Sequence, residues 1–225
     1  MRQYLPTILS VNAGYVDTAG FLALQGLFSA HVTGNFVTLG AALVQGSSGI
    51  IAKLLALPVF CLVVMLVRLA AGPLAGGPRQ LSVILGVQLI LLTAAGVMAA
   101  VFGPFPNVDS ADAVVTGMLL VCAMAVQNAV QRTHLSSFPP TTLMTGNTTQ
   151  IMIDLADVLR GHPAPGLSAR LRRNALSVAG FGSGCAAGAA LFSTIDMLCF
   201  ALPPGIALLS IFMTADDTPK APPES

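Results

Sequence analysis

Charged residues are scarce in this sequence. Only 8% of its 225 residues are Asp, Glu, Lys or Arg, whereas 55% are hydrophobic. A soluble domain carries about 25% charged residues, because its surface must face water. The shortage excludes an ordinary soluble fold and indicates a chain that lies in a lipid bilayer. The net charge of +1 offers no basic patch, so we expect no nucleic-acid partner.

Cysteine and histidine are too few and too scattered to suggest a metal centre. The four cysteines stand singly, with no CxxC pair and no Cys/His cluster, at positions 61, 122, 185 and 199. Zinc and redox sites normally need such clusters. We therefore expect no metal and no cofactor, and we interpret the cysteines as small hydrophobic residues.

Long stretches of the chain contain no charge at all. A helix needs about 20 mostly apolar residues to cross a bilayer. The uncharged stretches are 18–52, 54–67, 80–108, 113–131, 133–153, 174–195 and 197–215. They predict an all-α membrane protein with several crossings. Asp17 interrupts the first apolar segment and only Arg2 precedes it, so we expect that segment to be retained rather than cleaved as a signal peptide.

A short phrase is repeated half a chain apart. Thr-Gly-Asn stands at 33–35 and again at 145–147, and Asp17 and Asn128 precede the two triplets at similar distances. The matched context favours an internal duplication over a chance match. We expect Pro203-Pro204 to kink or break the last helix. The predicted helices lie near 5–27, 31–46, 52–71 and 81–103, and near 112–132, 141–160, 174–193 and 197–213.

The positions of the basic residues distinguish two possible topologies, one in which 31–46 and 141–160 span the membrane and one in which they are re-entrant. The distinction is possible because cytoplasmic loops carry an excess of Lys and Arg. If 31–46 and 141–160 both span the membrane, seven of the ten basic residues lie inside; if both are re-entrant, nine do. The second count predicts six transmembrane helices, two re-entrant half-helix segments and two cytoplasmic termini. Three crossings per half would invert the second half (109–214) relative to the first (1–108). The cytoplasmic tail, 215–225, is expected to be disordered.

Two longer phrases carry a resemblance to a known family. They are GYVDTAGFLALQGLFSAHVTGNFVTLGAAL at 14–43 and AMAVQNAVQRTHLSSFPPTTLMTGNTTQIMIDL at 123–155. With them the sequence resembles the YoaK-like family of bacterial inner-membrane proteins, a domain of unknown function, over essentially its whole length. One departure is Ala-Val-Gln-Asn-Ala in place of Gly-Met-Gln-Asn-Ala. The resemblance implies a multi-pass protein of the bacterial inner membrane and implies no activity.

Asp17 is the strongest functional candidate, because a carboxylate within a membrane helix costs about 2.5–3.5 kcal/mol on insertion scales. Such a residue binds a cation or carries a proton; the alternative is a structural hydrogen bond to Asn12, Tyr15 or Asn128. His31 is a second candidate for proton or ion coupling, since histidine titrates near neutral pH. One straight helix would place Asp17 and His31 about 20 Å apart, which argues against a direct pair.

The two triplets are expected to begin half-helices near the middle of the membrane. Their free N–H groups and positive dipole ends would favour a polar or anionic solute there. The alternative is that the asparagines merely cap the helices. The predicted solute site consists of Asp17, Thr33, Gly34, Asn35, Asn128, Thr145, Gly146 and Asn147.

Gly180, Gly184 and Gly188 form a stripe of small residues on the helix near 174–193. Such a stripe permits close contact between helices. The contact could lie within one chain or join two copies in a homo-oligomer.

A transporter or channel for a small solute is the function that these features favour, with the bilayer and the solute as its partners. An intramembrane enzyme using Asp17 and His31 is the first alternative. No nucleophile elbow, HExxH motif or phosphate loop is present, so the balance is against an enzyme. A non-catalytic membrane scaffold is the second alternative, and the interior carboxylate counts against it.

Overall fold

The computed structural model describes residues 2–70, 78–161 and 165–215, and the secondary structure of these residues is entirely helical. The predicted all-α class is therefore confirmed. Each of the eight predicted helices has a counterpart. They are α1 (Leu5–Ala23), α2 (Asn35–Gln45), α3 (Ile50–Ala70), α4 (Pro78–Phe102), α5 (Ala111–Thr133), α6 (Met144–Leu159), α7 (Leu167–Ile195) and α8 (Leu202–Ala215).

Four segments of the described chain are long and apolar enough to cross a membrane. They are Ile50–Ala70, Arg79–Phe102, Ala111–Thr133 and Leu167–Thr214, the last of which contains both α7 and α8. These segments mark the chain as a multi-pass membrane protein.

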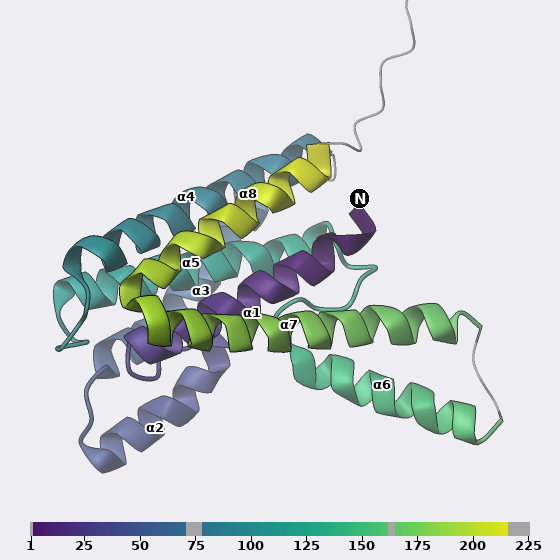
Figure 1. Cartoon of the computed structure of the whole chain (residues 1–225), viewed down its shortest axis with the longest axis horizontal. Helices are drawn as coiled ribbons and strands as arrows, with labels where there is room; N and C mark the ends of the chain where they lie inside the picture. Colours follow the sequence, from purple (N-terminus) through teal and green to yellow (C-terminus); the bar gives the residue numbers. More distant parts are fainter. Residues whose placement is uncertain (1, 71–77, 162–164, 216–225) are drawn as a thin grey trace, which may run out of the picture.

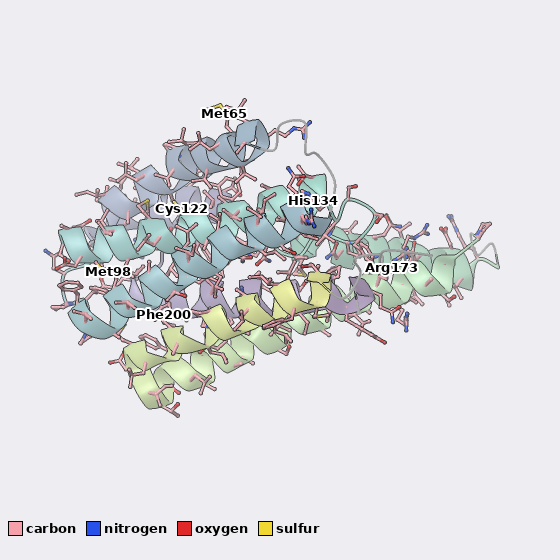
Figure 2. All side chains as sticks on the ribbon, turned by 90° about the horizontal axis from the view of Figure 1, so that it is seen from above. Met65, Met98, Cys122, His134, Arg173 and Phe200 are labelled. Carbon is pink, nitrogen blue, oxygen red and sulfur yellow. The ribbon has the colours of Figure 1, made fainter. Side chains whose placement is uncertain are left out.

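The helices α1, α3, α4, α5, α7 and α8 run roughly along the long axis of the molecule, and α2 and α6, called the short helices below, lie on one side of this bundle (Figure 1). α8 has 14 residues against 16 in α6, but it continues directly from a 3-10 helix at Asp196–Ala201. Both short helices begin near the middle of the long axis and diverge toward opposite ends. In Figure 2, the labels of Met65 in α3 and His134 after α5 lie near the ends of these two helices, and α6 with the start of α7 extends well beyond both.

The two halves of the sequence interlock rather than form separate domains. The most extensive contact joins α1 of the first half to α7 of the second. α5 packs against both α3 and α4, and α8 packs against α4 and α1. Each short helix rests on the helix that follows it, α2 on α3 and α6 on α7. The predicted halves, 1–108 and 109–214, therefore both contribute to each of the two hydrophobic clusters of the core.

The glycine stripe of α7 accounts for the close approach of α1. A Cβ atom added at Gly184 would overlap the carbonyl oxygen of Val11, and one at Gly188 would lie 2.8 Å from the carbonyl oxygen of Tyr15. The three stripe glycines are buried against α1. Of the two contacts considered from the sequence, the structure has the one within the chain.

Two helix boundaries differ from the prediction for physical reasons. α8 begins at Leu202, so Pro203 and Pro204 fall in its first turn. Proline is tolerated there because no N–H group is needed. The segment predicted as one helix over 197–213 is divided just before the prolines, into a 3-10 helix at Asp196–Ala201 and α8. α7 begins at Leu167 rather than near 174, because Arg170 pairs with Asp154 of α6 and extends the helix beyond its apolar part. Of the predicted disordered tail, only Ala215 lies within the described residues, as the last residue of α8.

Candidate functional site between α1, α2 and α7

Asp17 lies in the second half of α1 and is only 4% exposed. α1 ends at Ala23, and the backbone then turns through two residues with positive φ, Gln25 (48°) and Gly26 (95°). This turn brings the following loop back alongside α1. The backbone N–H groups of Ser29 and Ala30 each donate to Oδ1 of Asp17 at 2.8 Å.

His31 completes the environment of the carboxylate. Its Nδ1 lies 2.8 Å from Oδ2 of Asp17, and 30% of its side chain is exposed. The ring makes edge contacts with Phe28 and Phe181, at centroid distances of 6.4 and 5.3 Å. Asp17 and His31 therefore form a direct pair, and the separation expected for one straight helix is wrong because the helix ends between them.

An open pocket of about 590 Å³ lies over this pair. Its walls come from α1, from the segment that leads into α2, and from α7. Four of the residues predicted for the site, Asp17, His31, Thr33 and Gly34, are thus brought together. The lining consists of Asp17, Thr18, Phe21, Leu22, Phe28, His31, Thr33, Gly34, Phe181 and Cys185.

The asparagines of the two triplets do not cap their helices. The N-cap residues are Gly34 for α2 and Leu143 for α6, and neither cap has a side-chain hydrogen bond. Instead each asparagine reaches back seven residues. Nδ2 of Asn35 donates to the carbonyl of Phe28 at 2.8 Å, and Nδ2 of Asn147 donates to the carbonyl of Pro140 at 2.9 Å. The asparagines therefore fasten the segment that enters each short helix, and the capping interpretation is wrong.

The second triplet lies away from the pocket. Thr145 belongs to an open groove of about 700 Å³ along one face of α6, whereas an added Cβ at Gly146 would meet no atom within 4 Å. Oδ1 of Asn128 accepts a hydrogen bond from the hydroxyl of Thr142 at 2.8 Å. The predicted site residues thus divide into two groups, one around Asp17 and the other around Asn128 and α6.

These residues lie within 5–213, the part of the chain that matches the family described as "Protein of unknown function (DUF1275)". The chain belongs to this family. The match covers more than half of the sequence and is consistent with the resemblance drawn from the two phrases. No curated protein and no solved structure matches the chain.

Sequence reasoning missed the aromatic walls of the pocket in this DUF1275 chain. Phe21 and Phe28 pack together with ring centroids 4.9 Å apart, and Phe181 covers His31 from α7. Cys185 lies one turn further along α7 and also lines the pocket. The sequence signal for this wall was the glycine stripe, because the stripe fixes which face of α7 meets α1.

A separate polar network lies in the core between α1, α4 and α5. Gln88 donates to Gln127 at 2.8 Å, and Gln127 donates to the carbonyl of Leu9 at 2.8 Å and to the hydroxyl of Thr141 at 3.1 Å. Interhelical hydrogen bonding is therefore a sufficient role for Gln127. Among the described residues, no three His, Cys, Asp or Glu side chains are grouped so that they could hold a metal ion.

Proposed function

We propose that this chain is a membrane transporter for a small polar or anionic solute. The observation that carries the proposal is the buried Asp17–His31 pair beneath an open pocket, at the point where a short helix begins near the middle of the molecule. Ionisable groups inside membrane proteins usually mark solute or proton pathways. In this proposal the pocket binds the solute and the pair carries a coupled proton.

The packing of the helices supports an internal repeat. Exchanging α1 with α5, α2 with α6, α3 with α7 and α4 with α8 converts each major contact into another that is also present. The α1–α7 contact becomes α5–α3, the α2–α3 contact becomes α6–α7, and the α4–α5 contact becomes α8–α1. Inverted repeats of this kind are a common plan of secondary transporters.

Local hydrogen bonds support the same repeat. Asn35 and Asn147 make matching bonds to carbonyls seven residues earlier. The Asp17–His31 contact and the Asn128–Thr142 contact both join residues 14 positions apart. The first half therefore has a titratable pair where the second half has a neutral one, so proton coupling would belong to the first half alone.

The directions of the helices support six crossings and two re-entrant segments. α3, α5 and α6 end, and α4 and α7 begin, toward the same side of the molecule, where α6 and α7 extend well beyond the other three (Figures 1 and 2). That side holds most of the basic residues, which favours placing it, together with both termini, on the cytoplasmic side of a bacterial inner membrane. The helix ends concerned carry Arg68, Arg79, Arg132, Arg160, Arg170, Arg172 and Arg173.

The chemistry of the pocket fits a small solute with a polar or anionic group. α2 begins beside the pocket with no acidic residue in its first turn, so Asp17, which is already bonded to the loop and to His31, is the one carboxylate in the pocket that faces the positive end of its dipole. Besides Asp17 and His31, Cys185 is the one titratable residue in the lining. The side chain of His31 is 30% exposed and that of Asp17 only 5%, so proton exchange between pocket and pair would run through His31.

Cys185 provides the test of the pocket. A chain that keeps Cys185 but lacks Cys61, Cys122 and Cys199 is labelled with a membrane-impermeant thiol reagent in proteoliposomes. We expect Cys185 to react, because it lines an open pocket. The matched control keeps Cys61 alone, on the exposed face of α3, where surrounding lipid should protect it. Solutes are then screened for protection of Cys185, and protecting solutes are assayed for uptake.

Uptake of a protecting solute should depend on a pH gradient in the parent chain, and His31→Gln should abolish that dependence. Thr142→Val, in the neutral pair of the second half, should keep it. If Cys185 resists labelling from both sides of the membrane, the pocket is not aqueous and the transport proposal fails. If His31→Gln leaves the pH dependence of uptake intact, coupling through the pair is wrong.

An intramembrane enzyme is the second candidate, and the same contact favours it. A histidine whose Nδ1 faces a carboxylate can present its other ring nitrogen as a general base. Thr33 and Cys185 line the pocket and are both possible nucleophiles, but neither makes a hydrogen bond to His31 within the described chain. Analysis of the protecting solute after incubation decides between the two functions, because a transporter returns it unchanged.

A further inference from the structure

A second pocket lies at the basic end of the molecule, beside the start of α1. It has a volume of about 250 Å³ and is enclosed by the first residues of α1, the first part of α7 and the loop at Phe138 and Pro139. Figure 2 places Arg173, on α7, at this end. The Asp17–His31 pair and its pocket lie further along α1, so the two pockets are distinct.

Two arginines without an acidic partner line this pocket. Arg170, earlier on α7, is paired with Asp154, whose oxygens it contacts at 2.6 and 2.9 Å. Arg172 and Arg173 line the pocket, and neither forms an ion pair within the described part of the chain. The lining contains no Asp or Glu. The pocket therefore has an uncompensated positive charge of two.

A buried hydroxyl group faces the same space. Ser177 lines the pocket although the residue is only 1% exposed, and its hydroxyl makes no hydrogen bond among the described residues. Tyr4 and Thr7, which also carry hydroxyl groups, line the pocket as well. The lining thus contains two residues with guanidinium groups and three residues with hydroxyl groups.

The start of α1 adds to the positive potential. α1 has 19 residues, no side-chain cap and no acidic residue in its first turn. The positive end of its dipole therefore faces this region without compensation. Arginine recognises phosphate through paired N–H groups, and hydroxyl donors complete such sites.

We propose that this pocket binds a phosphate group, held by Arg172 and Arg173 and by the hydroxyl group of Ser177. Two sources share this chemistry, the headgroup of an anionic phospholipid and inorganic phosphate. Basic pockets between helices at a membrane surface are a known form of headgroup site. The proposal goes beyond the transport function and does not rest on it.

The competing explanation is that the arginines only orient the chain in the membrane. Such a role needs basic charge at this end and no particular pocket. Arg132 and Arg160 provide the comparison, because they are exposed arginines at the same end of the molecule and do not line the pocket. Two double variants are compared. The pocket variant carries Arg172→Gln with Arg173→Gln, and the control variant carries Arg132→Gln with Arg160→Gln, so both lose two positive charges.

The full chain is reconstituted in vesicles of equal parts phosphatidylcholine and phosphatidylglycerol, and retained lipid is measured by native mass spectrometry. In a second arm, inorganic phosphate is titrated against the thermal stability of the chain in neutral detergent. We expect the pocket variant to bind its phosphate ligand about tenfold more weakly, because two charge-assisted hydrogen-bonding groups are lost. The Arg132/Arg160 variant should bind like the parent.

Retention of phosphatidylglycerol that the pocket variant loses identifies a lipid site. Stabilisation by inorganic phosphate without retained phosphatidylglycerol identifies a site for the free ion. If neither probe binds, or if both arginine pairs weaken binding equally, the proposal is overturned. Should the pocket variant fail to fold, Ser177→Ala keeps every charge and should still weaken binding severalfold; unchanged binding in that variant overturns the site.

Discussion

Oδ2 of Asp17 lies 2.8 Å from Nδ1 of His31, although the two residues are 14 positions apart. The contact exists because α1 ends at Ala23 and the loop after Gly26 returns along the same helix. Two backbone N–H groups of that loop bind the other carboxylate oxygen. Asp17 thus serves as the anchor of the loop as well as the partner of His31.

This double role predicts unequal effects for two substitutions of Asp17. Asp17→Ala removes the acceptor for the buried N–H groups of Ser29 and Ala30, and we expect a loss of about 3 kcal/mol of unfolding free energy, since each unsatisfied buried donor costs about 1–3 kcal/mol. Asp17→Asn keeps one acceptor oxygen and should lose less. Unfolding of the purified chain in mixed micelles measures both values.

Asp112→Ala is the matched control, because Asp112 is exposed in the first turn of α5. It should change stability much less than Asp17→Ala. Equal losses for Asp17→Ala and Asp17→Asn would mean that the anchoring bonds contribute little.

The helices of this fold could be predicted from the sequence because charge marks the ends of apolar stretches. Asp109 and Asp112 delimit α4 and α5, and Asp196 lies between α7 and α8. The rule failed at the start of α7, where arginines lie inside the helix. Arg170 is held there by Asp154, a pairing between distant residues that hydropathy cannot reveal.

The candidate site could be predicted only in part. The interior carboxylate and the repeated triplets indicated Asp17, Thr33 and Gly34, all of which line the pocket. The contact between Asp17 and His31 was missed because the first helix was predicted to extend to residue 27. The local sequence signal for the end of α1 lies at Gln25 and Gly26, because a glycine with positive φ commonly follows the last turn of a helix. The third wall comes from α7, and the glycine stripe indicated the face of α7 that packs closely but not that α1 is the helix it packs against.

The glycine contact between α7 and α1 makes a second prediction. Gly184→Ala places a Cβ against the carbonyl oxygen of Val11. Because backbone cannot move aside as a side chain can, we expect a loss of about 2 kcal/mol or more. Gly182→Ala, two residues away, would meet no atom within 4 Å and should be neutral or slightly stabilising.

Unfolding in mixed micelles separates the two alanine variants, and Cys185 labelling reports whether the pocket is disturbed by Gly184→Ala. Equal stability of the two variants would contradict the close contact between α1 and α7.

The ion pair between α6 and α7 makes a third prediction. Asp154 is fully buried and receives Nε and Nη2 of Arg170 as well as Nε2 of Gln150. Asp154→Ala should loosen α6 from α7, because it leaves the guanidinium without its partner. We expect faster hydrogen exchange along α6 and little change in α2, which is the internal control.

Exchanging the two charges, Asp154→Arg with Arg170→Asp, should restore part of the protection of α6. Protection of α6 that is unaffected by Asp154→Ala would show that apolar contacts alone hold α6 in place.

Labelling of two exposed turns makes a fourth prediction, which concerns the short helices. Ser47 lies after α2 and Gly161 lies after α6, and both are exposed. If both short helices are re-entrant, one crossing precedes residue 47 and four precede residue 161, so the two positions face opposite sides. If both short helices span the membrane, two crossings precede residue 47 and six precede residue 161, so the two positions share a side.

Single cysteines at 47 and 161, in a chain without the native cysteines, are labelled in intact cells and after permeabilisation. We expect opposite sides, because α2 and α6 begin near the middle of the molecule and diverge (Figure 1). Labelling from the same side would remove the inverted repeat and, with it, the structural analogy to transporters.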